Sequence, residues 1–254
     1  MKYADLAQWV SLGLFAAWLA VAALGVAGRR PRLSPSVLRG TGLVAALLVL
    51  QSWVVDAVAD PDGLSAADEP LLAWFVDHRS PGATAVLRVV TDLGGTLGMA
   101  ALTAVTAVVL LVRRHLREAV VVVVAGIGAG VLVAGLKSLY ARPRPPLATR
   151  LVVETNPSLP SGHALSSAVV VGIVAAVLVA HLPRLRAVVT AIAAAAVLAI
   201  GVSRLYLGVH WLTDVLDGWL VGGAWLTLCV LAMRAAHTVP ERSAAVEVSR
   251  ASLP

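Results

Sequence analysis

Long apolar stretches separated by short polar segments dominate the chain. A helix that crosses the hydrocarbon core of a bilayer needs roughly 20 mostly apolar residues. Seven stretches meet this length, at about 7–28, 40–58, 86–112, 117–140, 163–182, 187–206 and 210–233. The segment 59–82 breaks the pattern with five carboxylates, and its part 70–76 is expected to form a short amphipathic helix at the interface. The pattern therefore predicts an all-α, polytopic membrane bundle of about seven spans.

The two ends of the chain differ from the region between them. The uncharged run in 7–28 is longer than the apolar part of a typical signal peptide, and basic residues follow it, so it is expected to be a retained helix. The polar residues after 233 show no periodicity, which predicts a disordered tail. The expected organisation is an additional helix with a basic loop (1–40), a core (41–233) and a tail (234–254).

Composition supports the membrane assignment and sets the orientation. Only 13% of the residues are charged, against about 25% in soluble domains. The single cysteine, Cys229, excludes an internal disulfide. The net charge of +6 comes largely from arginine-rich loops, which favour the cytoplasmic face, so no nucleic-acid partner is expected. The chain is predicted to lie in the plasma membrane with its carboxyl terminus cytoplasmic and its amino terminus outside.

A second group of polar residues lies at the opposite, outer ends of the spans. Ionisable groups at such positions are costly unless they are paired or hydrated, so they indicate a functional site. The candidate residues are Lys137, Arg144, Ser161, Gly162, His163, Arg204, His210 and Asp214. Alternation of the spans brings all of them to the same side of the membrane.

Five of these residues suit the binding of an oxyanion. Ser161 and Gly162 begin a span, where unpaired backbone N–H groups and the helix dipole attract negative charge. Lys137, Arg144 and Arg204 supply positive charge and hydrogen-bond donors that suit phosphate oxygens. The sequence therefore predicts a phosphate site.

The other three suit catalysis. His210 and Asp214 lie four residues apart, hence on one face of a helix. The carboxylate can accept the proton of one imidazole nitrogen and leave the other nitrogen free as a nucleophile or base. His163 is then a candidate acid for the leaving oxygen. No loop carries histidines and carboxylates at the spacing of metal ligands, so neither a metal nor another cofactor is expected.

Three segments resemble the three-part signature of the type 2 phosphatidic acid phosphatase (PAP2) superfamily. They are Lys137-Ser-Leu-Tyr-Ala-Arg-Pro-Arg144-Pro145, Pro160-Ser-Gly-His163, and Ser203-Arg204 followed by His210 and Asp214. The superfamily contains membrane lipid phosphatases, undecaprenyl diphosphate phosphatases, glucose-6-phosphatase and the vanadium haloperoxidases. The resemblance covers about 41–233, and its three motifs occur in the family's order and spacing.

The resemblance implies a role for each matching residue. His210 would attack phosphorus to form a phosphohistidine, Asp214 would orient it, and His163 would protonate the leaving group. Lys137, Arg144, Ser161, Gly162 and Arg204 would bind the phosphate, without a metal ion. The family core commonly has six spans, so 7–28 is a departure. Asp217 is not part of the signature and receives no role.

Several alternatives remain at this point. The expected substrate is a lipid phosphate, with undecaprenyl diphosphate ahead of phosphatidate or phosphatidylglycerophosphate. Transfer of phosphate to an alcohol and transport of an anion or lipid are the rival functions, although the sequence shows neither the helices broken near the bilayer midplane nor the repeated halves typical of transporters. Arg142 and Arg150 suit either lipid headgroups or substrate. The histidines outside the motifs are expected to be structural, namely His78, His115, His181 and His237. Gly218 and Gly222 predict a close helix contact.

Overall fold

Helices make up all the regular structure in the part of the chain that is described. The computed structural model describes residues 34–60 and 63–251, with side chains as far as residue 235. The α-helices are α2 (Pro35–Ala59), α3 (Asp68–Asp77), α4 (Pro81–Gly94), α5 (Thr96–Val112), α6 (Leu116–Tyr140), α7 (Gly162–His181), α8 (Arg186–Tyr206) and α9 (Leu212–Ala251). The 3-10 helices are η1 (Leu64–Ala67), η2 (Leu147–Thr149) and η3 (Pro183–Leu185). The all-α prediction is confirmed.

Most of the predicted spans correspond to single helices. Within the described residues, five helices are long and apolar enough to cross a membrane, or up to six if a bent pair counts as one span. The five are α2, α6, α7, α8 with the preceding η3, and the first part of α9. The predicted first span, 7–28, lies outside the described residues. The chain is therefore a polytopic membrane protein.

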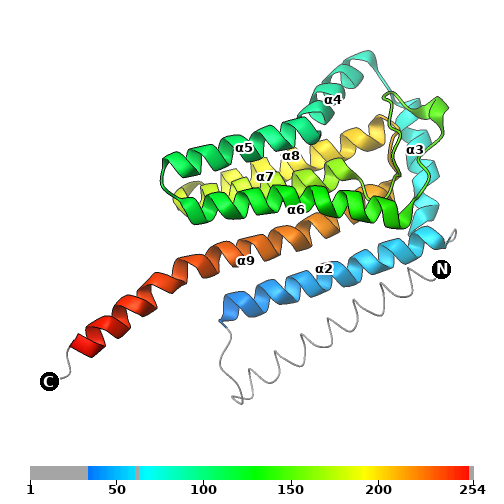
Figure 1. Ribbon diagram of the computed structural model, residues 1–254. Helices are drawn as coiled ribbons and strands as arrows, with labels where there is room; N and C mark the ends of the chain where they lie inside the picture. Colours follow the sequence, from blue (N-terminus) through cyan, green and yellow to red (C-terminus); the bar gives the residue numbers. More distant parts are fainter. Residues whose placement is uncertain (1–33, 61–62, 252–254) are drawn as a thin grey trace.

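The predicted span 86–112 is not one straight helix. The structure divides it into α4 and α5, which are bent by 50° (Figure 1). The break lies at Gly95, whose backbone is extended with φ −74° and ψ 176°. A Cβ on Gly94 would lie 2.4 Å from the side chain of Ile200, so a larger residue there would force Ile200 or the helices to shift. Apolar composition alone did not reveal this break.

The two polar segments also take definite forms. The amphipathic segment predicted at 70–76 is α3, which lies across one end of the bundle beside the loop that precedes α7 (Figure 1). The structure describes α9 as continuing to Ala251, whereas the sequence predicted a disordered tail from 234. A lack of hydrophobic periodicity indicates that a segment has no packing face, but it does not prevent helix formation.

The bundle is organised around α7. This helix packs against α6, α8 and α9, and α2 lies along α9 (Figure 1). The core between α6, α7 and α9 contains fully buried Val122, Val169 and Ile173. Large apolar side chains such as Leu97 and Ile192 are exposed on the outside, where a lipid environment would cover them.

Small residues allow α9 to lie close to the start of α7. A Cβ on Gly218 would lie 2.8 Å from the carbonyl oxygen of Ser161, and one on Gly222 would lie 2.8 Å from that of Leu165. The predicted close helix contact is thus confirmed. It lets the Ser161 backbone N–H donate to the Asp214 carbonyl oxygen at 2.9 Å, which joins two of the sequence motifs.

Candidate active site

His210 and Asp214 form a buried pair where α9 begins. The His210 Nδ1 atom lies 3.2 Å from Asp214 Oδ2, and both side chains are almost fully enclosed. The spacing of four residues had suggested a pair on one helix face. His210 instead lies in the turn before α9, and the carboxylate in the first turn reaches back to it. The Trp211 backbone N–H donates to the same Oδ2 at 2.9 Å, so Asp214 also caps the helix.

The surroundings of His210 determine where its proton lies. Arg144 NH1 lies 3.1 Å from His210 Nε2 and also donates to the Val209 carbonyl at 2.6 Å. A guanidinium can only donate, so Nε2 must accept and the proton must lie on Nδ1, toward Asp214. Burial lowers the pKa of His210 to about 3, although Asp214 opposes the shift. At neutral pH the imidazole is uncharged and Nε2 carries a lone pair.

Asp214 is itself fixed by a network of donors. The Ser158 hydroxyl donates to Oδ2, and Arg142 NH1 donates to Oδ1 at 2.6 Å. Arg142 NH2 donates to Asp68 at 2.8 Å, and Asp68 accepts the Thr213 backbone N–H at 3.0 Å and its hydroxyl at 2.7 Å. One guanidinium thus bridges two buried carboxylates from α3 and α9. Such a network can be stable in a nearly dry environment because its charges are paired and hydrogen-bonded.

The start of α7 supplies backbone donors. Ser161 is the N-cap, and α7 begins at Gly162. The Ser161 N–H is already bonded to the Asp214 carbonyl, which differs from its expected use toward an anion. The N–H groups of Gly162 and His163 lie in the first turn, where a helix provides no internal partner. The buried Ser161 hydroxyl has no hydrogen-bond partner among the described residues.

Lys137 lies in the last turn of α6 beside this helix start. Its Nζ atom donates to the carbonyl of Pro157 and lies 3.4 Å from that of Ser158. A Cβ on Gly162 would lie 3.9 Å from Lys137 Cε. The ammonium group therefore fixes the loop that leads into α7 and stands next to the free backbone donors.

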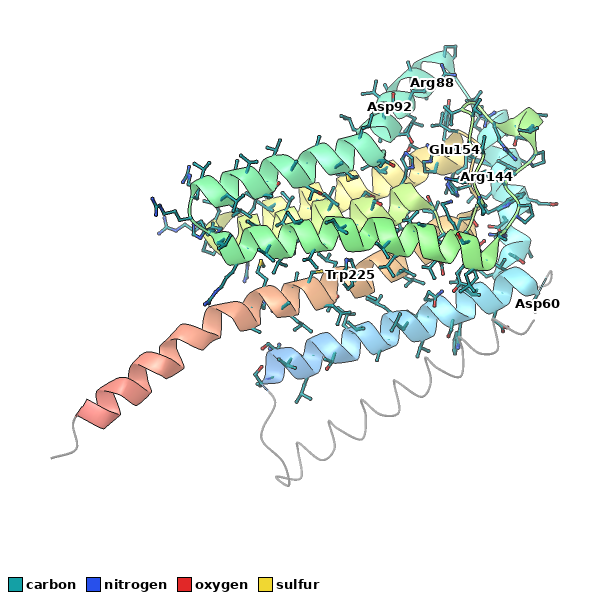
Figure 2. The ribbon with its side chains drawn as sticks, viewed as in Figure 1. Asp60, Arg88, Asp92, Arg144, Glu154 and Trp225 are labelled. Atoms are coloured by element: carbon teal, nitrogen blue, oxygen red, sulfur yellow. The ribbon has the colours of Figure 1, made fainter. Side chains whose placement is uncertain are left out.

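Glu154 connects the two arginines that the sequence assigned to phosphate binding. One of its oxygens accepts a hydrogen bond from Arg204 NH2, and the other lies 3.7 Å from Arg144 NH2. Glu154 and Arg144 lie near each other at the end of the bundle (Figure 2). Arg204 is buried and also donates to the Thr91 hydroxyl at 2.6 Å, while its Nε has no partner among the described residues. A carboxylate therefore occupies donors that would suit phosphate oxygens.

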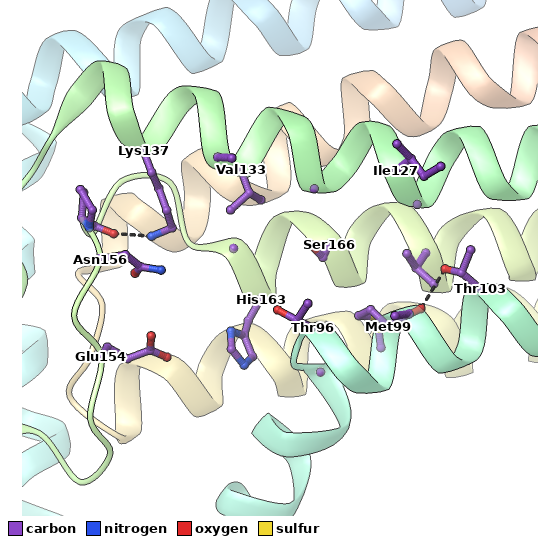
Figure 3. A pocket seen from close by; sticks show the side chains of 18 of the residues that line it. Thr96, Met99, Thr103, Ile127, Val133, Lys137, Glu154, Asn156, His163 and Ser166 are labelled. Carbon is purple, nitrogen blue, oxygen red and sulfur yellow. Dashed lines mark hydrogen bonds between the residues drawn. The ribbon is translucent and has the colours of Figure 1, made fainter.

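A cavity of about 800 Å³ joins these groups to the apolar interior between α5 and α6. Its polar end contains Lys137, Arg144, Glu154, Gly162, His163 and His210. Its other end is lined mainly by small and apolar side chains, including Val123. Met99 and Ile127 belong to this end (Figure 3). The structure thus brings five of the eight sequence candidates to one cavity. Ser161, Arg204 and Asp214 lie behind its wall.

His163 faces the break between α4 and α5. A Cβ on Gly95 would lie 3.5 Å from His163 Nε2, and both histidines of the candidate site line the same cavity. The bend at Gly95 therefore sets the wall of the cavity beside His163, which a straight span 86–112 would not have provided.

Comparison with known proteins identifies the architecture. The model of the PAP2 superfamily matches residues 118–237. Phosphatidylglycerophosphatase B of Bacillus subtilis (strain 168) is 32% identical over 178 residues, which cover 69% of this chain and 87% of that protein. This chain belongs to the PAP2 superfamily.

Solved structures agree with this membership. The crystal structure of the transmembrane PAP2 type phosphatidylglycerolphosphate phosphatase from Bacillus subtilis has a TM-score of 0.72 at 28% identity, over 78% of this chain and 98% of that one. Aquifex aeolicus LpxE has a TM-score of 0.52 at 21% identity, over 66% and 95%, and shares the fold. The chain is a PAP2 lipid phosphatase, a phosphoric monoester hydrolase of the membrane.

Sequence reasoning missed several residues around the candidate site of this PAP2 phosphatase. Arg142 appeared to suit either headgroups or substrate, but its guanidinium is engaged by Asp68, Thr213 and Asp214. The position of Arg142 inside the first motif, between Lys137 and Arg144, was the only indication in the sequence that it belongs to the site. Asp68 is remote in sequence and gave no signal. Asp217, for which the sequence offered no role, accepts a hydrogen bond from Gln51 at 3.0 Å.

Proposed function

We propose that this PAP2 phosphatase removes the terminal phosphate of phosphatidylglycerophosphate through a phosphohistidine formed on His210. The observation that carries the proposal is the uncharged His210, whose Nε2 faces Arg144 at the polar end of a largely apolar cavity. The choice of substrate follows the relatives, since both the 32% identical protein and the structure of higher TM-score are named for phosphatidylglycerophosphate or phosphatidylglycerolphosphate.

The first chemical step is a displacement at phosphorus. The lone pair of His210 Nε2 forms the N–P bond while the bond between phosphorus and the lipid oxygen breaks. Asp214 stabilises the positive charge that develops on the imidazole, because it already accepts the Nδ1 proton at 3.2 Å. His163 in its protonated form gives its proton to the leaving oxygen, which departs as the lipid alcohol.

The second step restores the enzyme. The now neutral His163 takes a proton from a water molecule, whose oxygen attacks phosphorus. The N–P bond breaks, the electron pair returns to His210, and inorganic phosphate leaves. An alcohol in place of this water would give phosphotransfer instead, with the same residues in the same roles.

Positive charge around the cavity would bind the phosphoryl oxygens. Arg144, Lys137 and the N–H groups at the start of α7 converge on its polar end. Glu154 has to move away when phosphate enters, because one carboxylate and a dianionic phosphate compete for Arg204 and Arg144. Arg204 NH2, which now donates to Glu154, then donates to a phosphoryl oxygen that takes the place of the carboxylate.

The lipid chains would extend from this site along the cavity between α5 and α6. Its apolar lining suits acyl and polyprenyl chains equally, so any preference among phosphatidylglycerophosphate, phosphatidate and undecaprenyl diphosphate has to arise at the polar end. The sequence ranked undecaprenyl diphosphate first because of the expected outer location. The names of the two relatives now favour phosphatidylglycerophosphate.

The proposal places the site on the outer face of the plasma membrane and the carboxyl terminus in the cytoplasm. The support is the group of arginines at the end of the spans away from His210, namely Arg39, Arg113, Arg114, Arg117, Arg184 and Arg186, whereas Arg142, Arg144 and Arg204 beside His210 belong to the candidate site. The division into 1–40, 41–233 and 234–254 is proposed with it. A carboxyl-terminal tag that is accessible from outside intact cells would contradict this orientation.

Phosphate release by the purified protein tests the substrate. The three lipid phosphates are compared in matched detergent micelles, with His210→Ala as the inactive control. We expect kcat/KM for phosphatidylglycerophosphate to exceed the others about tenfold, or about 1.4 kcal/mol in transition-state binding. A comparable preference for undecaprenyl diphosphate would overturn the substrate and leave the phosphatase assignment intact.

A further inference from the structure

Three side chains with metal-binding atoms meet at the end of the bundle opposite His210. His115 precedes α6, Glu118 lies in the first turn of α6, and His181 is the last residue of α7. Lys137, at the other end of α6, is roughly 28 Å away along the helix axis. The cluster is therefore separate from the candidate phosphatase site. The sequence did not reveal the cluster, because only helix packing brings His181 beside His115 and Glu118.

The distances within the cluster are close to those of a metal site. His181 Nε2 lies 2.8 Å from Glu118 Oε2, and His115 Nδ1 lies 3.9 Å from Glu118 Oε1. One ligand atom from each of the three residues lies within 4.8 Å of the others. Ligand atoms around tetrahedral zinc are about 3.3 Å apart for bonds of about 2.0 Å. Small rotations of two half-exposed imidazoles would close the remaining difference.

The chemistry of the three residues favours a divalent transition metal. Two imidazoles and one carboxylate form a ligand set that zinc sites use, with a fourth position left for water. Glu118 is buried, with 3% of its surface exposed, and a buried carboxylate requires compensating positive charge. Glu118 already has partners in the structure, His181 among them, and a metal ion between the two imidazoles would add further positive charge beside this carboxylate.

Charges around the cluster both favour and oppose the binding of a cation. The carbonyl groups at the carboxyl end of α7 carry partial negative charge beside His181 and favour a cation. The adjoining turns carry arginines that oppose it, namely Arg113, Arg114, Arg117, Arg184 and Arg186. The ligand bonds must therefore outweigh this repulsion, which selects for metals that bind imidazole strongly rather than for calcium or magnesium.

We propose that His115, Glu118 and His181 bind Zn²⁺ or a similar divalent transition metal ion. The ion would connect the beginning of α6 to the end of α7 and so stabilise the end of the bundle away from the phosphatase chemistry. The alternative is a plain hydrogen-bonded pair between Glu118 and His181, which needs no metal and leaves His115 3.9 Å from the carboxylate.

Metal binding by the full-length protein in detergent, free of any polyhistidine tag, distinguishes a metal site from a plain pair of Glu118 and His181. Equilibrium dialysis should show retention of roughly one Zn²⁺ per chain, and Co²⁺ should give the visible absorption of a low-coordinate site. His115→Ala and His181→Ala should each remove the retained Zn²⁺ and the Co²⁺ absorption. His78→Ala, which changes an exposed histidine on α3's side of the bundle, should leave both unchanged.

Two further measurements complete the test. Zn²⁺ should raise the thermal unfolding midpoint of the wild type but not of His115→Ala, whose half-exposed side chain can be removed without disturbing the core. A chelator should reverse that shift while phosphate release continues. No saturable binding in the wild type, or equal binding in all three variants, would overturn the proposal.

Discussion

Glu154 accepts a hydrogen bond from the buried Arg204 guanidinium, and its second oxygen lies 3.7 Å from Arg144. The carboxylate thus joins a residue at the end of α8 to one in the loop after α6. In a phosphatase, these donors would be expected to face phosphoryl oxygens. The pair therefore describes a state in which the protein's own carboxylate occupies part of the anion site.

Removal of the Glu154 charge should strengthen anion binding. Glu154→Gln keeps the shape of the side chain but removes the negative charge that pairs with Arg204 and lies 3.7 Å from Arg144, so the inhibition constant of inorganic phosphate or vanadate should fall about tenfold, or about 1.4 kcal/mol. KM should fall more than kcat changes. Glu69→Gln, an exposed glutamate on α3, is the matched control. Weaker inhibition in Glu154→Gln would show instead that the carboxylate orients Arg204 for substrate.

Substitution of His210 should reduce phosphate release more severely than substitution of Asp214. His210→Ala removes the attacking nitrogen and should abolish phosphate release. Asp214→Asn leaves that nitrogen but no longer favours the proton on Nδ1, and the analogous change in a hydrolase triad costs roughly 10⁴-fold in kcat. Asp92→Asn, an exposed position on α4, serves as the control. Near wild-type turnover by His210→Ala, in protein that elutes as a folded species, would refute the phosphohistidine mechanism.

The bridge from Asp68 through Arg142 to Asp214 should contribute to both stability and rate. Arg142→Lys cannot span two carboxylates that lie 2.8 Å and 2.6 Å from separate guanidinium nitrogens. We expect a loss of about 1.5–3 kcal/mol in the free energy of unfolding and a lower kcat. Arg150→Lys is the matched control, because Arg150 donates to the loop carbonyls of Pro145 and Glu154 and bridges no carboxylates in the described part of the chain. Equal effects of the two substitutions would contradict a special role for Arg142.

The stability of the protein should depend on pH through His210. Burial lowers the pKa of this imidazole from 6.5 to about 3, so between these values the unfolded chain binds the extra proton. Protonation of the unfolded chain at this histidine therefore reduces the free energy of unfolding. The reduction is absent above pH 6.5 and grows as pH falls toward 3. Thermal unfolding in detergent should therefore show a smaller decrease in midpoint from pH 7 to pH 5 for His210→Gln than for the wild type.

The exposed His78 provides the comparison for that experiment. His78→Gln, which changes an exposed histidine in the loop after α3, should retain the full decrease between the two pH values. If His78→Gln reduces the decrease as much as His210→Gln does, the pH dependence does not arise from burial of His210.

The sequence by itself determined the membrane architecture and the candidate residues. Spans such as 117–140 and 163–182 were predictable because the thickness of a bilayer imposes a length and a composition on each helix. The motifs around Lys137, His163 and His210 were recognisable because phosphate chemistry needs a few residue types at fixed positions near helix ends.

Only the tertiary structure decided how these residues are connected. The bend at Gly95, the position of Glu154 between two arginines, and the bridge from Asp68 to Asp214 all depend on the rotation and close approach of neighbouring helices. The same is true of His115, Glu118 and His181, which packing of α6 against α7 brings together. Hydrophobicity fixes how long a membrane helix is, but lipid solvates every apolar face almost equally, so side-chain packing and hydrogen bonds decide which faces meet.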